Sequence, residues 1–444
     1  MLGRRVRVCV GAWRRALSSG VAPDVCATAA ARSNRGAAES LRLLRLPDTL
    51  EDALEDACRA ELRRVSRKGL GFHDVDAAPT VHEFAAARLD LAYAAARRVL
   101  HEVSLRLPGF VPAIALDFRA GLAPFAWAAR ARWAERAPSA VAVEPSAALR
   151  GLGSRLASAV QLDVQWHASL PPADGGEGGA GAPTYDLVSA AYALSPLTAE
   201  ASDLTLTALW RSTAVGGVLA LVEPATEAGF AAVLRARELL VRSEQGGPGR
   251  ILAPCPHALH CPLDPEGARA PWGRADRRPR SALCHVQQRV VESRLRQYWE
   301  RQARRGDERR RLSEAFCYLL LHREPTGGGG GGGDDTRGEG YVESAAVTEA
   351  PAWSRVLRTP RKRRGHVYVD TCSPKAEATT TVVTRARAAR PAYRLARKLR
   401  QGDTVVLGTN GGVRLLADEE GDGEDGEYYY EDMEDDSRGR DRRS

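Results

Sequence analysis

Cysteine is sparse in this chain of 444 residues, and long hydrophobic runs are absent. Its eight cysteines are spread from Cys9 to Cys372. Such wide spacing excludes a disulfide scaffold, which leaves metal binding and burial in a core as the roles to consider. No segment approaches the roughly 20 apolar residues that a membrane-spanning helix requires. The length is sufficient for about two or three domains, with ample material for a core.

Acidic residues are absent from the start of the chain. The segment from Met1 to Ala22 contains five arginines and two serines, and the first acid is Asp24. A segment that is rich in arginine and serine and free of acid is typical of a mitochondrial transit peptide, although a disordered basic tail is the alternative. We therefore expect residues 1–23 to be a transit peptide that directs the protein to the mitochondrial matrix.

Acidic residues are concentrated instead at the other end. From Asp418 to Ser444 the chain has 13 acidic residues and 4 arginines, a net charge of −9. Because the whole chain has a formal net charge of +8, the remainder has a charge of +17. A body this basic favours a polyanionic partner such as RNA. The composition predicts a disordered acidic tail over residues 418–444.

Helices are predicted before the first strand, so residues 24–105 are expected to form a disordered lead and then a helical region. Between Asp48 and Arg64, apolar residues recur every four positions, which is typical of one face of a helix. Cys58 lies on that face and is expected to be a core residue. Thr80 and Glu83 form a capping box that predicts the start of a long alanine-rich helix.

Apolar strands and helices alternate after residue 110. Two short strands end in the acids Asp117 and Glu144, and a tight loop and a helix lie between them. This order is typical of the opening of a nucleotide- or S-adenosylmethionine-binding Rossmann-like domain. Further buried strands are predicted at Tyr185–Tyr192 and Gly216–Pro224. We therefore expect an α/β fold with a doubly wound sheet in a domain over residues 106–325.

The loop after the first of these strands is short of glycine. Loops that bind S-adenosylmethionine usually contain an acid followed by three alternating glycines, whereas residues 117–123 retain only the middle one, Gly121. Glycine allows strained φ angles and close approach of the backbone to a ligand, and Arg119 adds a long side chain here. Asp117, Gly121 and Glu144 are therefore candidate cofactor-binding residues of a weak or lost site. No catalytic residue is predicted, because Ser189–Tyr192 replaces the expected Asn-Pro-Pro-Tyr motif.

A loop with three prolines contains Cys255 and Cys261. Proline is unfavourable in a helix interior or a central strand, so a loop is expected here. Cys284 and Cys372 have similar settings in turns or at strand ends, whereas Cys317 lies in an apolar strand and is expected in the core. Four thiolates suit an iron–sulfur cluster or tetrahedral zinc. Because the four cysteines do not form two CxxC pairs, spacing alone leaves a shared site open.

Basic residues dominate after the proline-rich loop. Seven consecutive glycines predict a flexible linker over residues 326–341, followed by a basic β-rich module over residues 342–417. Basic runs at 277–311 and 355–400 are expected to contact phosphates, with Trp299, Trp353 and Tyr393 available for base stacking. The alternative for each run is a solvated face. The candidate RNA-binding residues are Arg277, Arg278, Arg304, Arg305, Arg361, Lys362, Arg363, Arg364, Arg397 and Lys398.

Several segments resemble one known family in the same order. They include Pro108-Gly109-Phe110, Val143-Glu144-Pro145-Ser146, Glu227-Ala228-Gly229-Phe230, Pro254-Cys255-Pro256-His257 and Gly365-His366-Val367. Over about residues 80–405 the chain resembles the methyltransferase-like protein 17 family of the mitochondrial small ribosomal subunit. The resemblance implies a class I methyltransferase fold that acts as an assembly factor for that subunit.

The resemblance also implies a cofactor and partners. It implies an iron–sulfur cluster of the 4Fe-4S type on Cys255, Cys261, Cys284 and Cys372. The implied partners are small-subunit rRNA and ribosomal proteins, with no membrane and no DNA, and S-adenosylmethionine is a doubtful ligand. Two other functions are open at this point: an active S-adenosylmethionine-dependent rRNA methyltransferase, and an RNA-binding protein held together by zinc.

Overall fold

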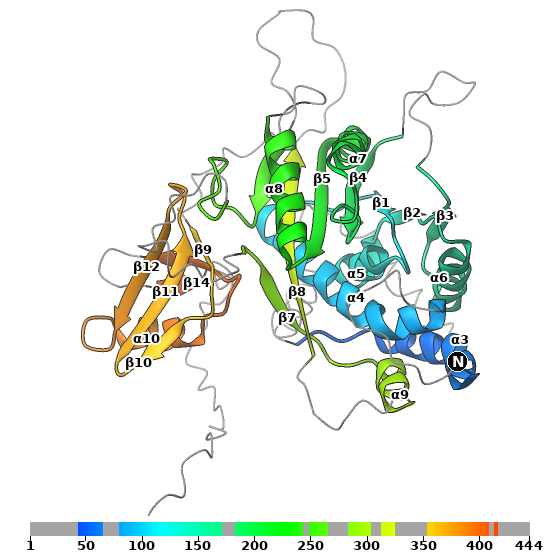
Figure 1. Ribbon diagram of the computed structural model, residues 1–444, viewed down its shortest axis with the longest axis horizontal. Coiled ribbons are helices and arrows are strands. Elements are labelled where there is room, and N and C mark those ends of the chain that lie inside the picture. The colour runs from blue at the N-terminus through cyan, green and yellow to red at the C-terminus, as the bar shows by residue number, and fades with distance from the viewer. Residues whose placement is uncertain are drawn as a thin grey trace, which may run out of the picture.

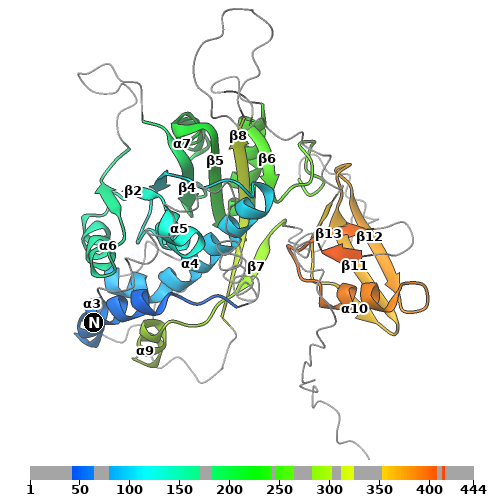
Figure 2. The ribbon, with the colours of Figure 1, turned by 180° about the vertical axis from the view of Figure 1, so that it is seen from behind.

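The computed structural model describes residues 43–64, 80–170, 183–242, 247, 249–264, 283–302, 312–324, 353–407 and 413–415. The predicted transit peptide, glycine linker and acidic tail lie outside these residues. Within them, an eight-stranded sheet and a six-stranded sheet lie side by side (Figures 1 and 2). Among the helices described, none combines the length and the apolar composition needed to cross a membrane.

The larger sheet has the strand order β3-β2-β1-β4-β5-β8-β6, and β7 also pairs with β8. The neighbouring strands from β3 to β5 are parallel, whereas β8 is antiparallel to both β5 and β6. This is the Rossmann-like sheet of class I methyltransferases, so the predicted fold class is confirmed. The strands are β1 (Ile114–Phe118), β2 (Ser139–Val143), β3 (Val164–His167), β4 (Tyr185–Ala191), β5 (Thr213–Pro224), β6 (Gly249–Ala253), β7 (Val286–Arg289) and β8 (Ser313–Arg323).

Helices cover both faces of this sheet, which explains why its central strands are apolar throughout. In β5, Val218, Ala220 and Val222 face the core beneath α3 to α6. The intervening Leu219 and Leu221 face a second core beneath α7 and α8. The helices of this part are α3 (Asp48–Arg64), α4 (Val81–Arg106), α5 (Pro124–Trp133), α6 (Ala147–Ala159), α7 (Ala199–Ser212), α8 (Glu227–Val241) and α9 (Arg294–Gln302), and a 3₁₀ turn, η3 (Ala134–Arg136), follows α5.

Local sequence signals account for the first two helices. In α3 the predicted apolar face is buried, and Cys58 is 0% exposed in the core, as expected. At the start of α4, Thr80 Oγ1 accepts a hydrogen bond from the Glu83 amide at 3.2 Å, which confirms the cap. The α4 helix then runs along the sheet to Arg106 and carries Glu102 near its end.

The smaller sheet is antiparallel, with the order β10-β11-β9-β13-β14 and with β12 paired to β11. The helix α10 (Arg390–Lys398) packs on it through Ala396. The three longest strands of this sheet cover residues 366–372, 378–384 and 404–407. The full set is β9 (Ser354–Val356), β10 (Arg361–Arg363), β11 (His366–Cys372), β12 (Ala378–Thr384), β13 (Thr404–Leu407) and β14 (Val413–Leu415).

Some elements were not predicted from the sequence. The segment that leads into the proline-rich loop forms strand β6, which pairs with β8 through an irregular register at Ile251 and Ala253. The helices α6 and α9 and the short strands β3, β9, β10 and β14 also gave no clear signal. Three or four residues are too few for a recognisable period, and β10 consists only of charged residues.

Candidate metal centre and nucleic-acid interface

Four cysteines from three separate segments line one small cavity. Cys255 and Cys261 lie in the loop after β6, Cys284 precedes β7, and Cys372 is the last residue of β11. All four line the cavity together with Arg237, His257 and Arg355. The fold thus brings together the four residues that the sequence marked as metal-ligand candidates. Cys317 is 0% exposed within β8 and belongs to the core, as expected.

The four thiols are in a low-dielectric setting. Burial raises the pKa of Cys261 to about 11 and that of Cys372 to about 12, and the neighbouring thiol of Cys255 adds to both shifts. Burial also raises the pKa of Cys255 and Cys284. Because a metal binds the thiolate form, loading this site must release protons and couples metal binding to pH.

The donor set bears on which group the cavity could hold. All four candidate ligands are cysteines. Four thiolates are a known donor set both for iron–sulfur clusters and for tetrahedral zinc. The residues present therefore fit either group.

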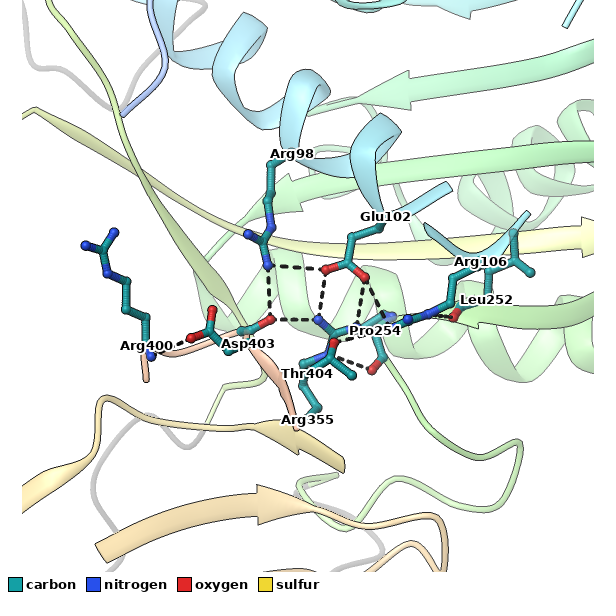
Figure 3. A network of polar contacts seen from close by, with 10 residues as sticks. Arg98, Glu102, Arg106, Leu252, Pro254, Arg355, Arg400, Asp403 and Thr404 are labelled. Atoms are coloured by element: carbon teal, nitrogen blue, oxygen red, sulfur yellow. Dashed lines mark hydrogen bonds and ion pairs between the residues drawn. The ribbon is translucent and has the colours of Figure 1, made fainter. Parts of the chain in front are cut away.

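A buried ionic network lies beside the cavity (Figure 3). Arg355, in β9, is 1% exposed. Its terminal nitrogens Nη1 and Nη2 bind Glu102 of α4 at 3.0 and 3.2 Å. Burial favours the neutral form of Glu102, but Arg355, Arg98 and Arg106 together hold its pKa well below the usual range. Arg355 Nε also donates to the Pro254 carbonyl at 3.0 Å. This network joins the C-terminal sheet to α4 and to the proline-rich loop.

The same arginine links two of the cysteines. Its Pro254 hydrogen bond fixes the carbonyl that precedes Cys255, and Arg355 is the antiparallel partner of Cys372 between β9 and β11. The sequence placed Arg355 in a basic run expected to contact phosphate. That expectation is wrong for Arg355, because its side chain is buried and paired within the protein.

The methyltransferase loop keeps its backbone shape without its glycines. Arg119, Gly121 and Ala123 have φ angles of 51°, 56° and 55°, so all three alternating positions are left-handed. This is the region that normally favours glycine. The ring of Phe84 covers the loop, since a Cβ placed on Gly121 would lie 3.4 Å from Phe84 Cζ.

The acids expected to hold a cofactor are bound to the protein itself. Glu144 accepts hydrogen bonds from the amides of Gly121 and Ser146, each at 2.9 Å. Asp117 Oδ1 accepts one from Ser189 Oγ at 2.9 Å, while its buried Oδ2 has no hydrogen-bond partner among the described residues. Burial raises the pKa of Asp117 to about 7, against the opposing effect of the Ser189 hydrogen bond. Both side chains are less than one-tenth exposed, so Asp117, Gly121 and Glu144 fit S-adenosylmethionine poorly.

Tyr192, at the place of the missing Asn-Pro-Pro-Tyr motif, also contacts other residues of the protein. The hydroxyl of Tyr192 donates to Glu314 Oε1 at 2.7 Å, and the Arg88 guanidinium lies 4.9 Å from the centre of the Tyr192 ring. Arg88 in turn pairs with Glu314 at 3.0 Å. The geometry therefore gives this position a packing role.

A large cavity in the C-terminal sheet is lined by cations, and we name it the basic basin. Its volume is about 680 Å³. One wall is a face of α10, on which Arg390, Arg394 and Arg397 recur at helical spacing. The opposite side is formed by β10 and the segment after β12. The lining residues are Lys362, Gly365, Arg385, Arg390, Tyr393, Arg394, Arg397 and Lys398.

The basic basin has the charge of an anion site. No acid lines it. Six arginine and lysine side chains line the basin. Five of them have no carboxylate partner within the described residues: Lys362, Arg385, Arg390, Arg394 and Arg397. Unpaired, exposed cations around a hollow are suited to phosphate groups.

The predicted RNA-binding residues divide into three groups. Lys362, Arg397 and Lys398 line the basic basin. Arg361, Arg363 and Arg364 are exposed on or beside β10, where Arg361 pairs with Asp370 at 3.3 Å. Arg277, Arg278, Arg304 and Arg305 lie outside the described residues. Arg385, Arg390 and Arg394 belong to the basic run 355–400 but were not among the residues named as candidates, although the helical spacing of Arg390 and Arg394 with Arg397 was a usable signal.

The three aromatic residues proposed for base stacking also differ. Tyr393 lines the basic basin. Trp299 is only 8% exposed and packs in the core beside α3 and α4, so stacking on a base is wrong for it. The guanidinium groups of Arg106 and Arg355 lie over the Trp353 ring, at 4.3 and 5.2 Å from its centre. The ring therefore already makes cation–π contacts within the protein.

Comparison with known proteins shows the family. A family model described as mitochondrial small ribosomal subunit Rsm22 matches residues 78–406, which is most of the chain. The chain belongs to the Rsm22 family. The match confirms the resemblance drawn from the sequence motifs, and it covers both the cysteine cavity and the basic basin.

Two curated relatives and one solved structure are similar to this chain to different degrees. Human "Ribosome assembly protein METTL17, mitochondrial" is 27% identical over 337 residues, covering 73% of this chain and 62% of the human protein. The fission yeast "Rsm22-cox11 tandem protein 2, mitochondrial" is 32% identical over 200 residues, or 43% of this chain and 25% of that protein. The structure of precorrin-6y C5,15-methyltransferase from Geobacter metallireducens has a TM-score of 0.28 and 14% identity, covering 50% of this chain and 85% of that one.

Proposed function

We propose that this chain is a mitochondrial protein that assists assembly of the small ribosomal subunit by binding its rRNA. In this proposal the C-terminal sheet supplies the RNA-binding surface, and an iron–sulfur cluster on four cysteines ties that sheet to the methyltransferase-like sheet. The observation that carries the proposal is the Rsm22 family match over residues 78–406. The printed names of both curated relatives place those proteins in mitochondria, and that of the human relative describes ribosome assembly.

The cysteine cavity supports the structural part of the proposal. Cys255 and Cys261 come from one sheet's loop and Cys372 from the other sheet, so a group bound by all would cross-link the two. When bound, a cluster supplies four iron–sulfur bonds at this junction. Because metal binding energy is folding energy for such a site, the position of the C-terminal sheet would depend on it.

The basic basin supports the RNA-binding part. RNA with unpaired nucleotides presents both phosphates and exposed bases, and the basin offers cations together with the ring of Tyr393. The methyltransferase loop, in contrast, has its acids bound internally and gives no support for methyl transfer.

Metal analysis tests the cluster. The full chain is purified without oxygen, and iron, sulfide and zinc are measured beside the visible absorption spectrum. We expect a coloured protein with iron and sulfide in comparable amounts. A colourless protein that contains zinc and no iron would instead support the zinc-stapled alternative.

RNA binding is tested with paired arginine variants. Arg394→Ala with Arg397→Ala should weaken binding to small-subunit rRNA and reduce the slope of log affinity against log salt by roughly 1.4, since each lost phosphate contact contributes about 0.7 for single strands. Arg130→Ala with Arg136→Ala removes two exposed arginines from the methyltransferase-like part and is the matched control. Equal losses in both pairs would contradict a role for the basic basin.

A further inference from the structure

Arg237 is an unusual buried arginine beside the cysteine cavity. It lies on α8, is 5% exposed, and lines the cavity together with all four cysteines. Its Nη2 donates to the carbonyls of His257, at 3.2 Å, and Leu259. Both carbonyls lie between Cys255 and Cys261, so Arg237 holds the loop that carries the first two thiols.

The positive charge of Arg237 has no carboxylate partner in the part of the chain that the structure describes. Its Nε is buried and makes no hydrogen bond there. The other deeply buried arginines are matched by acids: Arg296 pairs with Asp90 at 2.8 Å, and Arg355 pairs with Glu102 at 3.0 Å. A buried cation without an anion is strongly unfavourable, which implies that an anion belongs in this cavity.

A loaded four-cysteine centre would be that anion. Four thiolates bring four negative charges, and either a zinc ion or an oxidised iron–sulfur core offsets only two of them. Burial raises the pKa of Cys255, Cys261 and Cys372, and the charge of Arg237 works against the rise in all three, so it lies close enough to act on them. Arg355 also lines the cavity, but its charge is already balanced by Glu102.

We propose that Arg237 is the counter-cation of the four-cysteine centre, a positioning residue that neutralises its charge while holding the loop of Cys255 and Cys261. The inference rests on the proposed centre and adds a residue that is not one of its ligands. It also explains why a guanidinium is found at a site where the protein supplies no carboxylate.

Charge compensation and simple tethering of the loop predict different results. Arg237→Gln removes the charge and retains an amide donor, whereas Arg237→Lys retains the charge and loses the planar fork. Arg235→Gln is the matched control, because Arg235 lies two residues away on α8, is exposed, and pairs with Asp203 at 2.6 Å. All variants are made in the full chain and purified without oxygen.

Two measurements decide between these roles. The first is the rate at which a chelator removes metal, followed by visible absorption and metal analysis, together with the midpoint potential if iron is present. We expect about tenfold faster release and a lower potential for Arg237→Gln, less than threefold for Arg237→Lys, and no change for Arg235→Gln. The second is the stability of each protein after the metal is removed, where Arg237→Gln should equal or exceed the wild type because no anion then faces the cation.

The outcomes separate the inference from the proposed function. Equal metal loss in Arg237→Gln and Arg237→Lys, with a less stable metal-free protein in both, would mean a tether only and would overturn the inference. Retention of metal and an unchanged potential in Arg237→Gln would overturn it as well. If the wild type binds neither iron nor zinc, the proposed centre itself fails, and the counter-cation role fails with it.

Discussion

The methyltransferase loop and the cysteine cavity are both polar sites within a largely apolar core, but they differ in how their groups are satisfied. At the methyltransferase loop, Glu144 and Asp117 Oδ1 bind the protein's own amides and hydroxyl, whereas Asp117 Oδ2 is buried with no hydrogen-bond partner among the described residues. At the cysteine cavity, four thiols and Arg237 face one another with no carboxylate among the lining residues. Glu144 is satisfied internally, and Asp117 can become neutral because burial raises its pKa to about 7. The Arg237 guanidinium cannot lose its charge and therefore needs an anion.

This difference gives the two sites different expectations. Arg119 and Ala123 adopt left-handed φ angles although neither is glycine, so this backbone shape forms here without glycine at those positions. In the proposed function, the chemistry open to an external group is thiolate ligation, so the two sites can be tested against each other by substitutions.

The largest effect is expected at the cysteine cavity. Cys372→Ser removes one of four candidate ligands and should abolish metal loading, with a loss of about 5 kcal/mol or more in stability of the loaded protein, because structural metal sites contribute on the order of 10 kcal/mol. In cells, steady-state protein and small-subunit assembly should fall together. Cys58→Ala is the control, since Cys58 is buried in a different core. Normal protein levels and assembly in Cys372→Ser would rule out a structural centre.

A smaller effect is expected at the ionic network beside the cavity, where the arginines surround an acid of the protein itself. Glu102→Gln leaves Arg98, Arg106 and Arg355 around a neutral group, and breaking a buried ion pair in this way costs about 3–5 kcal/mol. Urea unfolding of the metal-free chain measures the change. The exposed pair of Asp203 and Arg235 provides the control, where Asp203→Asn should change stability little. Similar effects for both substitutions would mean that the network does not join the two sheets.

The sequence predicted what depends on local pattern and missed what depends on long-range pairing. The capping box at Thr80 and the apolar run of β5 each contain enough signal in one segment to define an element. The four cysteines could be selected because proline and strand ends mark exposed turns. Arg355 could not be told from its basic neighbours, since its burial depends on Glu102, which lies 253 positions earlier. Arg237 likewise looks like an ordinary charge on an amphipathic helix until the cavity beside it is known.

The third prediction concerns pH and the methyltransferase loop. Burial raises the pKa of Asp117 in the folded protein to about 7, above its ordinary 3.8, so the fold favours the protonated acid. The stability that this provides is present below about pH 4 and is lost as pH rises toward 7. Asp117→Asn cannot ionise, so its stability relative to wild type should increase by roughly 2–3 kcal/mol between pH 5 and pH 8. Urea unfolding at both pH values measures this, and a difference that does not vary with pH would contradict it.

The smallest effect is expected from restoring glycine to the loop. Arg119 is exposed and left-handed, so Arg119→Gly should leave stability unchanged or raise it by up to about 1 kcal/mol, while Arg119→Ala gains nothing from the backbone. Arg119→Gly with Ala123→Gly also rebuilds the three alternating glycines. We expect calorimetry to detect no S-adenosylmethionine binding to this double variant, because Glu144 still accepts the amides of Gly121 and Ser146. If the two glycines alone restore binding, the internal hydrogen bonds of Glu144 do not prevent S-adenosylmethionine from binding. The contrast with the cysteine cavity would then depend only on the backbone of this loop.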